Sequence, residues 1–153
     1  MAWSLVVDEL PELLRAFAEA EDVLRPAFSA AVGPYRFHAP IPEIDQFRPG
    51  TDAWRIAFRL DLPDRLAPYE DFACHLDLGA WGDGRQVSGW IDVRRYVGKG
   101  VTWDDELWAS ADHDVETPAE AAAAVRAVAA ELAAALGRLD LCPYLAGPNG
   151  GGP

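Results

Sequence analysis

The chain has 153 residues, half of them hydrophobic and a quarter charged, a balance typical of a globular domain that excludes an intrinsically disordered protein. Its formal net charge of −12 repels nucleic acid and anionic membranes, so we expect neither as a partner. No apolar run reaches the roughly 18 residues of a membrane span and no signal peptide is recognisable, so we expect one cytoplasmic domain over residues 1–146 and a disordered tail over residues 147–153.

An apolar stripe predicts a helix over residues 4–31. Leucines and phenylalanines recur there at three- and four-residue steps, which is the spacing of one helix face. Pro26 lies inside this segment, so the helix is expected to kink or divide there. In the next segment, residues 34–50, the prolines argue against an interior strand, and the aromatic residues favour an ordered loop along one edge of the domain.

The strongest strand signal is a hairpin over residues 72–97. Apolar and polar residues alternate there on both sides of Asp83-Gly84, a dipeptide that favours a two-residue turn. This turn would place His75 directly opposite Asp92. A slip of the pairing by one residue would bury the polar side chains, so the two faces of the hairpin are well specified.

Alternation also predicts a strand before this hairpin, over residues 53–62, and another after it, over residues 101–109. A three-residue loop between the hairpin and the last strand would bring Trp90 opposite Trp108. The same pairing sends the carboxylate of Asp105 toward the core, and we expect a bulge near residues 104–106 to relieve this burial of charge.

The segment Thr117-Pro118-Ala119-Glu120 is a capping box that predicts a second helix, which should end near Gly137. One further docked turn is expected within residues 139–145. Each helix has an apolar stripe, and the apolar face of the sheet is the surface that can bury both stripes. We therefore expect an α+β two-layer sandwich, in which a meander of three to four antiparallel strands has an N-terminal and a C-terminal helix packed on one face.

The other face of the sheet is polar, and any chemistry would lie there. His75 beside Asp92 would form the oriented imidazole of a catalytic site, but Ser88, the nearest hydroxyl on this face, has no nucleophile motif. Asp77 and His113 are of the right type to add metal ligands, yet only Asp77 shares a strand face with His75. We therefore predict no metal and no cofactor. A small enzyme or ligand-binding domain that uses His75 and Asp92 stays open as the alternative function.

Trp81 and Trp90 fall on the same polar face, where a solvated sheet normally carries Thr, Lys or Glu. Exposed aromatic residues beside arginines are typical of protein interfaces, although the loop over residues 34–50 would also account for the pair if it covered them. An acidic run that lacks lysine and arginine, residues 104–120, adds a negatively charged lobe. The residues expected to bind a partner are Arg55, Arg59, Asp77, Trp81, Trp90, Arg94, Asp104, Asp105 and Glu106.

These features favour a non-catalytic protein-binding module. The expected partner is another protein, of basic character, held by the exposed sheet face and the acidic lobe. An immunity-type protein or another inhibitor that neutralises a basic toxin or enzyme would fit this description by analogy. A homodimer joined through Trp81 and Trp90 is a further hypothesis.

Overall fold

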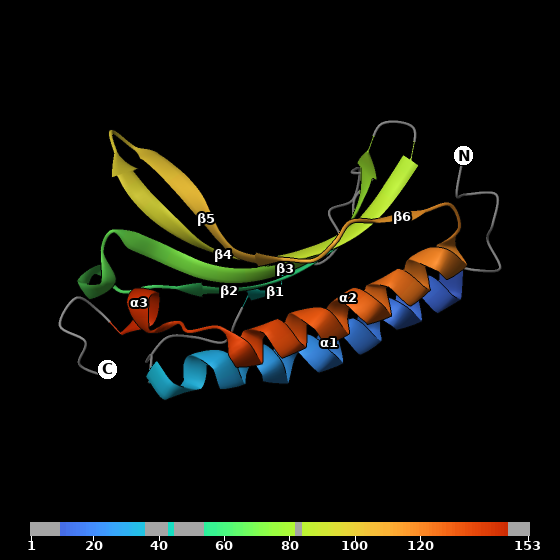
Figure 1. Ribbon diagram of the computed structural model, residues 1–153, viewed down its shortest axis with the longest axis horizontal. Coiled ribbons are helices and arrows are strands. Elements are labelled where there is room, and N and C mark those ends of the chain that lie inside the picture. Colours follow the sequence, from blue (N-terminus) through green and yellow to red (C-terminus); the bar gives the residue numbers. More distant parts are fainter. Residues whose placement is uncertain (1–9, 36–42, 45–53, 82–83, 147–153) are drawn as a thin grey trace.

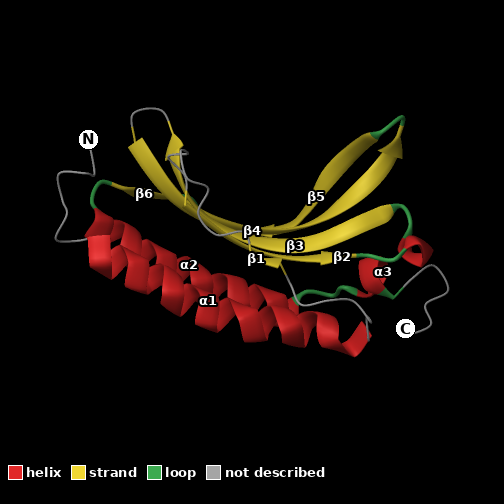
Figure 2. Cartoon of the chain, turned by 180° about the vertical axis from the view of Figure 1, so that it is seen from behind, coloured by secondary structure: helices red, strands yellow, loops and turns green. Residues whose placement is uncertain are grey.

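Two helices lie side by side on one face of a curved antiparallel sheet (Figures 1 and 2). The computed structural model describes residues 10–35, 43–44, 54–81 and 84–146, so the tail and most of the proline-rich segment lie outside it. Short 3-10 turns cover Gly33–Tyr35 and Asp64–Leu66. The remaining elements are α1 (Leu10–Val32), β1 (Glu43–Ile44), β2 (Trp54–Asp61), β3 (Tyr69–Trp81), β4 (Gly84–Gly98), β5 (Val101–Ala109), β6 (His113–Val115), α2 (Pro118–Arg138) and α3 (Cys142–Leu145).

The strands form a meander in the order β1-β2-β3-β4-β5, with every neighbouring pair antiparallel. The predicted α+β two-layer arrangement is confirmed, and its four strands correspond to β2 through β5. Two short strands were not predicted. β1 pairs with β2 at one edge, and β6 pairs with the start of β4, so that β5 and β6 lie end to end along the opposite edge. In the part of the chain that the structure describes, no helix has both the length and the apolarity needed to cross a membrane.

The two long helices end close to where the sequence places them, and the predicted start of the first helix, residues 4–9, lies outside the described residues. α1 is continuous from Leu10 to Val32, so the expectation that Pro26 divides it is wrong. Pro26 is exposed, and the residues on either side of it in the stripe, Leu24 and Phe28, stay fully buried against the sheet. α2 begins at Pro118 as predicted.

The start of α2 has the expected cap. The hydroxyl oxygen of Thr117 accepts a hydrogen bond from the backbone N–H of Glu120 at 3.1 Å. The docked turn after this helix is α3, and its Leu145 is fully buried.

The hairpin of β3 and β4 has a different register from the predicted one. Trp81 pairs with Gly84, and His75 lies opposite Trp90 rather than Asp92. The difference is a slip by two residues, which keeps every side chain on its face, so alternation alone does not distinguish the two registers. The observed register stacks the imidazole of His75 on the indole of Trp90, with ring centroids 4.7 Å apart.

A bulge in β5 is present, as expected, directly after residues 104–106. It falls at Leu107, so Trp108 pairs with Ile91 and not with Trp90. The pairing has a second irregularity nearer the turn, between Tyr96 and Gly98, and neither irregularity moves Asp105 to the outer face. The β4–β5 hairpin extends away from the helix layer (Figure 1). Asp105 therefore reaches solvent on the helix side, where it accepts a hydrogen bond of 2.8 Å from Nε of Arg95.

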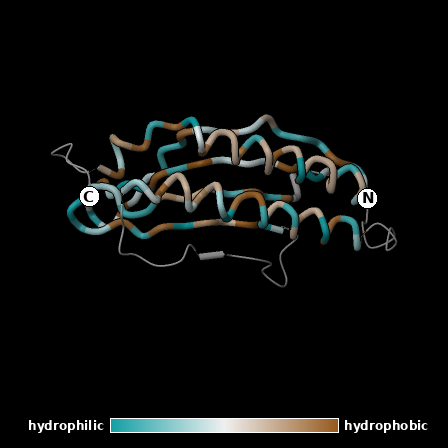
Figure 3. The backbone as a smooth tube through the Cα atoms, turned by 90° about the horizontal axis from the view of Figure 1, so that it is seen from below, coloured by the Kyte–Doolittle hydropathy of each residue, from teal (hydrophilic) through white to brown (hydrophobic). Residues whose placement is uncertain are grey.

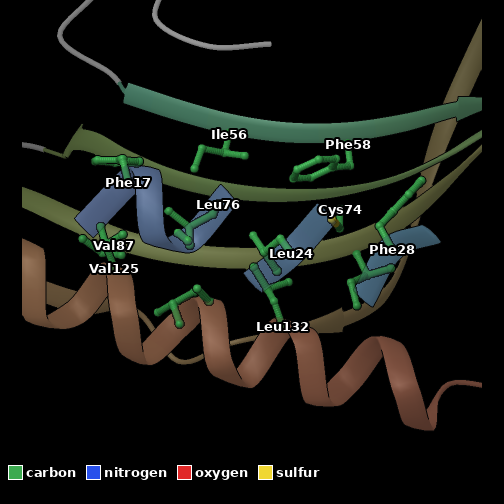
Figure 4. Close-up of a cluster of buried hydrophobic side chains, with 14 of the residues drawn as sticks. Phe17, Leu24, Phe28, Ile56, Phe58, Cys74, Leu76, Val87, Val125 and Leu132 are labelled. Atoms are coloured by element: carbon green, nitrogen blue, oxygen red, sulfur yellow. The ribbon is translucent and has the colours of Figure 1, made fainter. Parts of the chain in front are cut away.

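The core fills the space between the helix pair and the sheet. Seen from the helix side, both helices lie along the strands, and hydrophobic positions recur along each of them (Figure 3). Arg126 of α2 binds Glu12 and Glu19 of α1, which ties the starts of the two helices together. Figure 4 shows the centre of this core, with Phe17, Leu24 and Phe28 from α1, Val125 and Leu132 from α2, and Ile56, Phe58, Cys74, Leu76 and Val87 from the sheet.

Gly89 is the position where α2 lies closest to β4. A Cβ at this residue would lie 2.6 Å from Cγ1 of Val128 and 2.8 Å from Cδ1 of Leu132. Overpacking of this kind costs about 1–3 kcal/mol, so we expect Gly89→Ala to lower the free energy of unfolding by that amount in urea denaturation. Val128→Ala should recover part of the loss in a double-mutant cycle. A neutral Gly89→Ala would contradict the close approach.

Candidate functional site

The sheet face that points away from the helices is called the outer face below. The strands bend away from the helices at both ends of the sheet, so the outer face is concave (Figure 1). Alternation along the paired strands places polar and small residues on it. They are Arg55, Ala57, Arg59 and Asp61 of β2, Asp71, Ala73, His75 and Asp77 of β3, Ser88, Trp90, Asp92 and Arg94 of β4, and Asp104 and Glu106 of β5.

Three side chains form a hydrogen-bonded cluster at the centre of the outer face. Nε2 of His75 lies 3.3 Å from Oδ1 of Asp92, and the indole N–H of Trp90 donates to Oδ2 of the same carboxylate at 3.2 Å. The predicted contact between His75 and Asp92 is therefore present, although the two residues are diagonal neighbours and not directly opposite.

The geometry around His75 resembles half of a catalytic triad, but the imidazole is not accessible to a substrate. His75 is only 7 % exposed, and its Nδ1 is buried without a hydrogen-bond partner. Both oxygens of Asp92 are already engaged. Ser88 lies opposite Asp77, two pairs further along the hairpin from His75 and Trp90. A general base has to reach the proton that it removes, and the free nitrogen of this imidazole has almost no access to solvent.

The metal combination considered from the sequence is not assembled. His113 lies on β6 opposite Val87, a core residue, and therefore faces the helices while His75 faces outward. Among the described residues, no group of three or more histidine, cysteine or acidic side chains is arranged to hold a metal ion.

A second group of polar atoms surrounds Ala57, next to the imidazole. Nε of Arg59, Nδ1 of His75 and Oδ1 of Asp77 are all buried without a hydrogen-bond partner. Nε of Arg55 approaches Oδ1 of Asp77 at 3.5 Å, and the same guanidinium lies 5.6 Å from the centroid of the Trp90 ring. Buried polar atoms are normally paired, so this part of the face has unused binding capacity.

A row of charges crosses the sheet beside the central cluster. Arg94 lies between two carboxylates, 3.5 Å from Asp71 and 3.3 Å from Asp104. Burial raises the pKa of Asp71, and the nearby guanidinium groups of Arg94 and Arg59 oppose this shift only in part. Asp71 thus remains in a place that disfavours its charged form, which is more typical of a functional residue than of a stabilising one.

The raised pKa of Asp71 gives a prediction for stability. The folded state binds this proton more tightly than the unfolded state, so the free energy of unfolding falls as pH rises through the pKa of Asp71. We expect Asp71→Asn to be at least as stable as the natural chain at neutral pH in urea denaturation, and the difference should shrink in acid. Asp61→Asn, at the exposed neighbouring position, is the control. Loss of stability at neutral pH that disappears in acid would contradict the direction of the shift.

The acidic lobe predicted over residues 104–120 is divided between two faces at its start, in residues 104–106. Asp104 and Glu106 lie on the outer face, whereas Asp105 points to the helix side and binds Arg95. The exposed sheet face and the acidic lobe were predicted as two binding features. They form one surface, because Asp104 and Glu106 extend the row of carboxylates on the outer face.

Of the two tryptophans predicted to bind a partner, Trp90 lies on the outer face and its side chain is partly exposed. The side chain of Trp81 lies outside the described part of the chain. Asp71 was not predicted as a site residue, because the predicted hairpin begins at Phe72. Extending the alternation by one residue would have found it.

A cavity of about 380 Å³ lies away from this site, at the connection between β2 and β3. None of the residues around His75 forms part of its wall, so it adds nothing to the cluster around His75. The residues that line it are Leu62, Asp64, Ala67, Pro68, Tyr69, Glu70 and Tyr96.

Comparisons of the chain with protein-family models, with curated proteins and with solved structures found no match. The function therefore has to be argued from the outer face itself.

Proposed function

We propose that the protein is a non-catalytic protein-binding module that holds a basic partner on its concave outer face. The observation that carries this proposal is the composition of that face, where carboxylates outnumber guanidinium groups around a partly exposed tryptophan. Aromatic anchors with a charged rim are typical of interfaces in which a few residues supply most of the binding energy.

The charge balance favours a basic partner. The guanidinium groups of Arg55 and Arg94 already lie beside carboxylates of the same face, and a surplus of negative charge remains on the outer face. Exposed carboxylates at its rim, Asp61 and Glu106, would meet an approaching partner first. Complementary charge of this kind accelerates encounter and disfavours partners of the wrong sign.

Binding is better supported than catalysis because the imidazole is enclosed. A protein that acts by occupying its partner requires a rigid, charged surface and no reactive group. We therefore favour an immunity-type or other inhibitor protein that neutralises a basic toxin or enzyme, an assignment that rests on analogy of surface chemistry.

Charge variants on the two layers test the proposal. Asp61→Asn with Glu106→Gln removes charge from the outer face, and Asp22→Asn with Glu131→Gln removes the same charge from exposed positions of the helices. With the partner recovered from cells, we expect only the outer-face variant to slow association, by a few-fold at low salt, because screening acts within about 10 Å at 0.1 M salt. Equal slowing by both variants would contradict a binding site on the outer face.

Ligand binding at His75 and Asp92 is the second candidate. It is favoured by buried atoms of Arg59, His75 and Asp77 around Ala57 that have no hydrogen-bond partner and offer donors and an acceptor to a small polar molecule, with Arg55 3.5 Å from the carboxylate of Asp77. Small zwitterionic compounds that raise the melting temperature should lose this effect in His75→Ala. Compounds that stabilise both proteins equally would argue against this candidate.

A further inference from the structure

The last long strand of the meander, β5, has one open edge. In the described part of the chain β5 pairs only with β4, over Val101 to Ala109. The β4–β5 hairpin extends beyond the helix layer (Figure 1), so the helices do not cover this edge. An open edge presents a row of backbone N–H and C=O groups that can pair with another strand.

The side chains of β5 differ between its two sides. Asp104 and Glu106 lie on the outer face, whereas Trp103 pairs with Arg95 on the helix side. Trp103 is 62 % exposed and Val101 is 53 % exposed. Large exposed apolar residues on an edge strand contribute little to the fold that bears them, and they are typical of surfaces that bind other proteins.

We propose that an extended segment of the partner adds to β5 as a further strand of the sheet. This inference rests on the proposed function and specifies how the partner docks. Backbone hydrogen bonds supply affinity in strand addition, and alternate side chains supply specificity. The added segment should alternate in character, with basic side chains beside Asp104 and Glu106 on the outer face and apolar side chains beside Trp103 on the other.

A second copy of this chain would meet like charge if the two β5 strands paired about Asp105. Antiparallel pairing of β5 with β5 of another copy centred on Asp105 would set Asp104 of one copy against Glu106 of the other. Like charges directly opposite each other destabilise a strand pair. Acidic residues on an edge also guard against aggregation, but that role does not require an exposed Trp103 and Val101 on the same strand.

The test uses two synthetic peptides and the full chain. The first peptide alternates valine and lysine, and the second has the same charge but carries proline at alternate valine positions, which prevents it from forming a strand. We expect the first to bind at least about tenfold more tightly and to slow hydrogen exchange at the β5 amides that face the open edge. Glu106→Lys should weaken this binding about tenfold or more, and Glu131→Lys on α2 should not.

The outcomes separate strand addition from the broader proposal. Equal binding of both peptides, with slowed hydrogen exchange confined to β2, β3 and β4, would overturn strand addition. The proposal of a basic partner on the outer face would remain. Failure of the valine–lysine peptide to bind would also overturn strand addition. So would association of the chain into a dimer through β5, because the edge would then belong to a second copy.

Discussion

Leu76→Asp should unfold the protein. Leu76 is fully buried on the helix side of β3, between Ile56 on β2 and Gly89 on β4. The substitution places an unpaired carboxylate in the core, which costs several kcal/mol, about as much as the whole stability of a small domain. Circular dichroism and a thermal melt of the variant would show the loss of the cooperative transition.

The neighbouring substitution Asp77→Leu is the matched control. Asp77 faces outward, its Oδ1 has no hydrogen bond, and its ion pair with the half-exposed Arg55, at 3.5 Å, is of a kind that contributes little to stability. Replacing this carboxylate with a side chain of similar size should therefore change the melting temperature little. Equal destabilisation by the two substitutions would show that the two faces of β3 have been assigned incorrectly.

Trp90→Ala should weaken binding of the partner strongly. The indole lies at the centre of the outer face, where its ring stacks on His75 and its N–H bonds Asp92. Truncating a central aromatic anchor typically costs about 2 kcal/mol or more, which corresponds to a rise in Kd of about 30-fold. Surface plasmon resonance should assign the loss mainly to a faster dissociation rate.

Two further variants separate loss of contact from loss of structure. Trp90→Phe keeps an aromatic ring for the stack on His75 and should retain most of the affinity. Leu14→Ala removes an exposed apolar side chain from α1, on the opposite layer, and should leave Kd unchanged. If Trp90→Ala binds like the natural chain while its melting temperature is preserved, Trp90 is not an anchor.

The helices and the faces of the strands could be predicted because both depend on local periodicity. The apolar stripe with Leu24 and Phe28, and the capping box at Thr117, are visible within a few residues of sequence. The register of the β3–β4 hairpin depends instead on contacts between distant residues, such as the stack of His75 on Trp90. A slip by two residues leaves the pattern unchanged, so the sequence could not exclude it.

The faces on which the candidate residues lie could be predicted for the same reason. Residues of the outer face were assigned to the correct side by alternation, and His75 does contact Asp92 although the predicted register was wrong. The split of the acidic lobe follows from the predicted pairing, which sends Asp105 to the helix side, but the ion pair of Asp105 with Arg95 could not be predicted because it depends on β4. The exact position of the bulge, at Leu107, likewise depends on how β5 pairs with β4.

Hydroxyl-radical footprinting of the protein, alone and bound to the partner recovered from cells, tests the central claim most directly. Radicals oxidise accessible tryptophan and aliphatic side chains, so they report on both layers in one experiment. A partner on the outer face should protect Trp90 and leave the oxidation of Leu14 and Val23, which are exposed on α1, unchanged. Protection of Leu14 and Val23 with unchanged oxidation of Trp90 would place the partner on the helices and contradict the proposed function.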